Sequence, residues 1–116
     1  MPLDFKIARR GSGIQVVSLH GRLTFGPHTD RCKDAVRAAL ATGDRRFVFD
    51  LSGVDSADSA GLGFLVSCLV PIRQAGAELR LVSPPERVLH VLHITRLDTV
   101  FPIDTAQSQA LAHFGS

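Results

Sequence analysis

The sequence predicts an α/β domain in which about four helices pack on a mixed sheet of four to five strands, with residues 1–116 forming a single domain. Segments with strand-like apolar patterns alternate with segments of helical spacing along most of the chain, which is typical of parallel strands joined by helical crossovers. The first two strand-like segments are separated only by a short turn, which favours an antiparallel hairpin. A length of 116 residues suits one compact domain with its own core.

The N-terminal hairpin is predicted from two apolar segments on either side of a glycine-containing turn. Leu3, Phe5 and Ile7 alternate with charged or small residues, as expected of a half-buried edge strand. The turn at 11–13 contains two glycines, and the segment 14–20 after it is rich in apolar residues. We therefore expect two antiparallel strands at this end of the chain.

The middle of the chain predicts a helix, a buried strand and a second helix. Pro27 suits the first turn of a helix, and apolar residues recur at helical spacing until Gly43. The run 47–49 is apolar without alternation, which indicates a central strand covered on both faces. A turn of Ser, Gly and Asp residues follows, and then a helix from about 59 to 75. Because Pro71 lies inside this helix, we expect the helix to bend or break there.

The last third of the chain predicts two more strands and two more helices. Its final strand is weak, because Pro102 has no backbone N–H to donate to a neighbouring strand. Asp104 or Thr105 is expected to cap the terminal helix. The expected elements are a strand at 78–82, a helix entered through 83–86, a strand at 100–103 and a helix ending at His113.

Composition and charge argue against several classes of function. Thirteen basic and eleven acidic residues leave a formal charge of +2, and the chain has neither Trp nor Tyr, so nucleic-acid binding is not expected. No apolar run approaches the ~20 residues of a membrane span, and the first residues do not resemble a signal peptide. Cys32 and Cys68 fit no zinc or redox spacing. We expect a cytoplasmic protein with two reduced thiols and no metal.

Ser59 is the residue that the sequence singles out for function. It follows Asp58 directly, and both residues lie where a predicted strand and turn lead into a helix. The free N–H groups and the helix dipole at such a position favour negative charge. A hydroxyl next to a carboxylate at a helix start is therefore well placed for phosphate chemistry.

The helix after Ser59 has no charged residue before Arg73, which leaves two interpretations open. One face carries the apolar side chains expected to contact the core. A second, nearly uncharged face contains Phe64 and Cys68 together with small residues. It either packs between the sheet and neighbouring helices or forms an exposed contact surface beside Ser59, which a change of charge would switch.

The segment from Asp50 to Gly63, DLSGVDSADSAGLG, resembles the signature of STAS domains, and specifically of the bacterial anti-sigma factor antagonists. The resemblance covers nearly the whole chain, because other landmarks follow in the family order. These landmarks are Gly21–Leu23, the helix-to-strand junction Ala75–Leu79 and the segment Arg96–Phe101.

The resemblance implies a protein that is not an enzyme and needs no cofactor. Such a protein binds a kinase-type anti-sigma factor and thereby frees a sigma factor, in a partner-switching pathway. The kinase phosphorylates the hydroxyl after the motif's Asp, which here is Ser59, and a PP2C-type serine phosphatase reverses the modification. A phosphate adds about −1.5 to −2 charge, so we expect it to block the interface without refolding the domain.

The partner-binding residues implied by the motif lie around Ser59. Many antagonists have Asp where this chain has Thr24, which is expected to contribute to a neighbouring rim. Gly61 and Gly63 are expected to allow the partner to approach closely. The full expected set is Asp55, Asp58, Ala60, Gly61, Gly63 and Phe64, with Thr24, Phe25 and His28 on the rim.

Other functions are weighed beside this one. A STAS subunit that regulates the ATPase of a lipid ABC transporter is the first alternative, and a homodimer through the uncharged helix face is possible. A small serine hydrolase is the second alternative, because Ser59-Ala60-Gly61 supplies half of a nucleophile elbow, although Ala57 replaces its first glycine. His90 and His93 lie three apart on a predicted helix, a spacing that suits two helix-face histidines better than a metal site.

Overall fold

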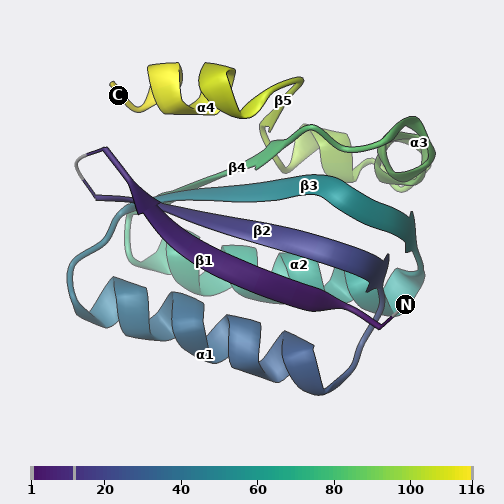
Figure 1. The fold of residues 1–116 in the computed structure, drawn as a ribbon, viewed down its shortest axis with the longest axis horizontal. Coiled ribbons are helices and arrows are strands. Elements are labelled where there is room, and N and C mark those ends of the chain that lie inside the picture. Colours follow the sequence, from purple (N-terminus) through teal and green to yellow (C-terminus); the bar gives the residue numbers. More distant parts are fainter. Residues whose placement is uncertain (1, 12, 116) are drawn as a thin grey trace.

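The computed structural model, which describes residues 2–11 and 13–115, contains a five-stranded sheet in the order β1-β2-β3-β4-β5 (Figure 1). The strands are β1 (Asp4–Arg10), β2 (Ile14–Leu23), β3 (Arg46–Ala57), β4 (Glu78–Val82) and β5 (Ile103–Asp104). β1 and β2 pair antiparallel, and every later pairing is parallel. The predicted α/β fold with an N-terminal hairpin is therefore confirmed.

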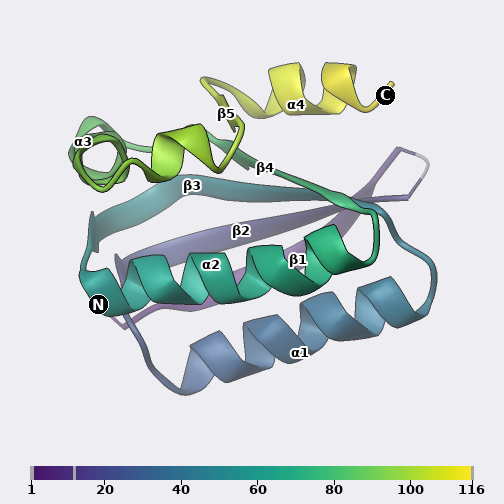
Figure 2. The ribbon, with the colours of Figure 1, turned by 180° about the vertical axis from the view of Figure 1, so that it is seen from behind.

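Helices cover both faces of this sheet. α1 and α2 lie side by side on one face, α4 lies on the opposite face, and α3 lies beside the end of β3 (Figure 1 and Figure 2). Among the described residues, no helix has the length and apolar character needed to cross a membrane. The helices are α1 (Pro27–Ala41), α2 (Ser59–Gln74), α3 (Glu86–Ile94) and α4 (Gln107–His113), and a 3-10 turn lies at Leu97–Thr99.

The sheet separates a large core from a small one. The run 47–49 of β3 contributes to both, since Phe47 and Phe49 belong to the large core with residues of α1 and α2, while Val48 belongs to the small core with Ala110 of α4. All three side chains are buried, as expected of a central strand. The small core consists of Ile14, Val16, Val48, Val82 and Ala110. The position of α2 is thus fixed by the larger core, which holds most of the apolar side chains.

β3 is longer than the sequence predicted. We expected a turn after 49, but the strand continues to Ala57, and Leu51 and Val54 are buried in the large core. The prediction was wrong because Ser, Gly and Asp residues are poor strand formers on their own. Here β2 pairs with this segment through two shifts in register, and Gly53 leaves room for the ring of His20. The continued strand delivers the chain directly to the start of α2.

The C-terminal segment also differs from the prediction. The final strand contains only Ile103–Asp104, because the 3-10 turn occupies the chain before Val100 and Phe101 is buried in the core. α4 begins after Ala106 without a side-chain cap. Asp104 does not cap it, because its carboxylate pairs with Arg80 at 2.8 Å. Thr105 does not cap it either, and instead bonds to the side chain of Gln109.

α2 continues past Pro71 to Gln74, so the helix does not break there into two pieces. Its uncharged second face is only partly internal: Phe64 is 3% exposed and Cys68 is 1% exposed, whereas Ala60 and Gly63 are exposed. Of the two interpretations of this helix, packing against neighbouring elements therefore accounts for the two buried side chains. The outward-facing residues of α2 are Ser59, Ala60 and Gly63 near its start, and Val70, Arg73 and Gln74 near its end.

Candidate functional site

Asp58 joins the end of β2 to the beginning of α2. Its backbone N–H donates to the carbonyl of Leu23 (3.2 Å), and its side chain is the N-cap of the helix, with Oδ1 accepting from the Gly61 amide (2.8 Å). The other carboxylate oxygen accepts from the hydroxyl of Thr24 (2.5 Å), which follows β2. The strand end, the loop after it and the helix start are therefore held together at one carboxylate.

The surroundings of Asp58 favour its ionised form. The hydrogen bond from the Thr24 hydroxyl is the main cause of a pKa held below the usual range of an aspartate. The Gly61 amide acts in the same direction, and the positive charge of Arg22 adds to it. Asp58 consequently carries a full negative charge at neutral pH.

Gly61 is needed by the fold itself. The helix start lies so close to β2 that a Cβ at this position would collide with the carbonyl group of Leu23 and lie 2.9 Å from the backbone nitrogen of Thr24. Gly61 is buried, so the expectation that it lets a partner approach is corrected: it lets β2 approach. At Gly63, by contrast, an added Cβ would meet nothing within 4 Å, and this residue is exposed.

Ser59 is exposed at the first position of α2. A helix start commonly offers free amides to an anion. Here the Asp58 carboxylate already accepts from the Gly61 amide. A phosphate on Ser59 would therefore lie next to an existing negative charge and would extend into solvent, where it changes the surface and leaves the cap in place.

Two further predicted residues, Phe25 and His28, line a groove that adjoins this site. The groove has a volume of about 370 Å³, and Phe25 is 66% exposed. Thr24, whose hydroxyl bonds to Asp58, is part of the same wall. We call this feature the Phe25 groove, and its lining consists of Pro2, Leu3, Thr24, Phe25, Gly26, Pro27, His28 and Thr29.

The remaining predicted contact residues differ in exposure. Asp55 and Ala60 are exposed, and the Asp55 carboxylate accepts from the Ser56 hydroxyl at 3.3 Å. Phe64, which we expected on the contact surface, is buried in the large core and does not present its ring to a partner. The spacing of apolar residues could not distinguish this, because α2 buries residues on more than one side.

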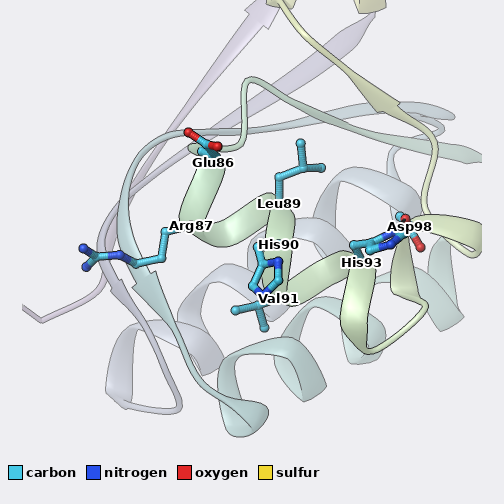
Figure 3. A pocket seen from close by; sticks show the side chains of 7 residues that line it. All are labelled: Glu86, Arg87, Leu89, His90, Val91, His93 and Asp98. Atoms are coloured by element: carbon cyan, nitrogen blue, oxygen red, sulfur yellow. Dashed lines mark hydrogen bonds and ion pairs between the residues drawn. The ribbon is translucent and has the colours of Figure 1, made fainter.

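A larger hollow of about 740 Å³ lies on α3 and contains none of the predicted partner-binding residues (Figure 3). His93 and Asp98 lie together there, 2.9 Å apart, whereas Arg87 points away from them. His90 lines the same hollow. No group of three metal-ligating side chains occurs in the part of the chain that the structure describes. The two histidines thus belong to a surface hollow of α3.

Sequence reasoning missed three residues at the site. Arg22 acts on Asp58 through its charge, and Pro2 and Leu3 form part of the Phe25 groove. The antiparallel register of the hairpin contains the missing signal, because it places Asp4 opposite His20. The residues before β1 therefore lie beside the end of β2, close to the segment that follows it.

The acid sensitivity of the fold tests the role of Asp58. Because its pKa is lowered in the folded state, its ionisation stabilises the protein above the unfolded pKa of about 3.9, and this contribution is lost as the pH falls through the folded value. Asp58→Asn keeps a capping residue but cannot ionise. We expect the difference in unfolding free energy between wild type and Asp58→Asn to shrink as the pH falls from 6 to about 3.

Urea unfolding at a series of pH values measures this difference. In Thr24→Val the main cause of the lowered pKa is removed, so an NMR titration should show the pKa of Asp58 moving up toward its usual range. If the difference in unfolding free energy between wild type and Asp58→Asn stayed constant with pH, the pKa of Asp58 would not be lowered by folding.

Comparison with known proteins places this geometry in a family. The sequence model that describes the STAS domain family matches residues 6–110 of this chain. A protein of Thermotoga neapolitana named as an anti-sigma factor antagonist is 42% identical over 72 residues, which are 62% of this chain and 64% of the relative, so the match spans less than two thirds of that relative's length. A Bordetella bronchiseptica protein of the same description is 28% identical over 102 residues, 88% of this chain and 87% of the relative.

A solved structure agrees with the sequence matches. The crystal structure of an anti-sigma factor antagonist from Thermotoga maritima superposes with a TM-score of 0.83 at 29% identity, covering 94% of this chain and 92% of that one. The family match over residues 6–110 includes most of β1, the other four strands, α1, α2 and α3, together with the junction between β3 and α2 that carries Ser59. The chain therefore belongs to the STAS domain family.

Proposed function

We propose that this protein is an anti-sigma factor antagonist that binds a kinase-type anti-sigma factor and is released when Ser59 is phosphorylated. The observation that supports this most directly is the exposed Ser59 hydroxyl at the first position of α2, beside a fixed and ionised Asp58. The descriptions of the related proteins agree with such a role. In this role the protein acts by binding, without catalysis and without a cofactor.

The contact surface is formed by exposed residues around Ser59. On the β3–α2 side the exposed residues near Ser59 in the chain are Asp55, Ala60 and Gly63, and Phe25 and His28 contribute from the segment after β2. These elements are held in place by the Thr24–Asp58 hydrogen bond before any partner arrives. A preformed surface of this kind binds without a large ordering cost.

Phosphorylation reverses binding by placing charge inside the interface. The phosphate stands next to the Asp58 carboxylate, which already accepts from the Gly61 amide through one oxygen and from the Thr24 hydroxyl through the other, so these two donors are not free to neutralise it. A partner docked over Ser59 has to desolvate this charge, and like-charge or unpaired-charge contacts cost several kcal/mol. A PP2C-type phosphatase restores the binding form, and the whole cycle takes place in the cytoplasm.

Affinity capture from the source cells tests the proposal. We expect wild-type protein and Ser59→Ala to capture a histidine-kinase-like ATPase, and phosphopeptide mapping of the native protein to locate phosphate on Ser59. Capture of a transporter ATPase, with no dependence on Ser59, would favour regulation of a lipid transporter. Ester hydrolysis that disappears in Ser59→Ala would favour the hydrolase instead.

A further inference from the structure

The Phe25 groove is an apolar hollow beside the switch residue. Phe25 leaves 66% of its surface exposed although the ring is large and apolar, while Leu3 at the groove is 4% exposed and belongs to the core. Burial of such a ring is favourable, and exposed aromatic side chains at the centre of an interface are frequent sources of binding energy. At about 370 Å³, the groove is at the lower end of the range of about 300–1,000 Å³ seen for ligand sites.

The groove is rigidly connected to Ser59. The loop that carries Phe25 is closed by the hydroxyl of Thr29, which donates to the Gly26 carbonyl (2.5 Å). At the other end of the loop, the hydroxyl of Thr24 donates to Asp58, the residue before Ser59. The groove and Ser59 therefore keep a fixed relative position, so a kinase that reaches the Ser59 hydroxyl also lies next to the groove.

Charge at the groove restricts what can occupy it. Two carboxylates contact its lining: Asp58 bonds to Thr24, and Asp4 lies 4.0 Å from the ring nitrogen of His28. The side chain of Asp4 is 68% exposed, so it is available to a partner. An apolar side chain with a cationic residue directed at Asp4 fits this arrangement, because the positive charge of Arg22 already acts on Asp58.

We propose that the Phe25 groove receives an apolar side chain of the anti-sigma factor, flanked by a basic residue that pairs with Asp4. The inference rests on the proposed function, because the occupant is the kinase that also acts on Ser59. It adds an anchoring contact that is separate from the phosphorylated residue. Contacts in the groove thereby increase the affinity for the anti-sigma factor, and phosphorylation of Ser59 determines whether the partner stays bound.

Photo-crosslinking in the source cells tests the groove and the proposed function separately. p-Benzoylphenylalanine is introduced in place of Phe25 in one strain and in place of Ala60, beside Ser59, in another. Each adduct is identified by mass spectrometry. We expect both positions to yield the same histidine-kinase-like ATPase.

Affinity measurements with that purified ATPase complete the test. We expect Phe25→Ala to weaken binding about tenfold or more. Ile94→Ala, a matched control that removes an apolar side chain with 62% exposure from the end of α3, should leave binding unchanged. Neither change should lower the thermal midpoint, because both side chains are exposed.

The other outcomes contradict either the groove proposal alone or both the groove proposal and the proposed function. An adduct from position 60 without one from position 25, or wild-type affinity in Phe25→Ala, refutes the groove and leaves the proposed function standing. A transporter ATPase at position 25 refutes the assigned occupant. If neither position crosslinks a protein, the proposed function fails and the groove proposal fails with it.

Discussion

Ser59→Asp should lose at least 100-fold in affinity for the anti-sigma factor while folding as the wild type does. The expected loss corresponds to about 2.7 kcal/mol, within the several kcal/mol that an unpaired or like charge costs in an interface. Ser59 is exposed, so the change itself removes no core contact. The new carboxylate lies in the first turn of α2, where the helix dipole is favourable and the nearby Asp58 is not.

These opposed local effects should leave the unfolding free energy within about 0.5 kcal/mol of the wild type, as is usual for surface substitutions. Isothermal titration with the purified anti-sigma factor measures the affinity, and urea unfolding measures the stability. Ser59→Asn is the matched control, because it has nearly the shape of aspartate without the charge. It should bind far more tightly than Ser59→Asp.

Two results would contradict interface blocking. If Ser59→Asn binds as weakly as Ser59→Asp, shape and not charge decides the affinity. If Ser59→Asp unfolds at clearly lower urea concentration than both other proteins, the charge disturbs the helix start, and the switch works through the fold. Asp58 would be the first place to look for that disturbance, since its carboxylate holds the cap.

Much of this architecture is predictable because local sequence signals agree with the tertiary structure. The run 47–49 is apolar without alternation, and it is buried on both sides of the sheet. Asp58 before a helical pattern predicts an N-cap, and the structure shows that cap bonded to Gly61. In such places propensity, periodicity and packing all favour the same conformation.

Other features depend on partners that are distant in the sequence. The extension of β3 past Asp50 requires pairing with β2 and space for His20 at Gly53, and neither appears in the local pattern. Phe64 looked like a contact residue because its helix has no charged neighbours, but its ring packs in the large core. The Phe25 groove combines the first residues of the chain with the loop after β2, so only the hairpin register reveals it.

Gly61→Ala, which adds only one methyl group, should destabilise the fold strongly. Gly61 has a helical backbone, so its role is spatial: an added Cβ collides with the carbonyl group of Leu23 and lies 2.9 Å from the Thr24 nitrogen. Both neighbours are backbone and cannot move aside by changing a rotamer. We expect a loss of about 3 kcal/mol in unfolding free energy, at the upper end of the usual cost of overpacking.

Gly63→Ala, two residues further along α2, is the matched control. An added Cβ there meets nothing within 4 Å, so the substitution should stabilise the helix by about 0.5–1 kcal/mol through the higher helix propensity of alanine. Urea unfolding of the two variants measures the contrast. Because relief of the clash requires α2 to move away from β2, Gly61→Ala should also weaken the Thr24–Asp58 hydrogen bond, with a rise in the pKa of Asp58. Equal stability of the two variants would mean that the start of α2 is not held against β2, and the fixed position of Ser59 on which the proposed function rests would have to be abandoned.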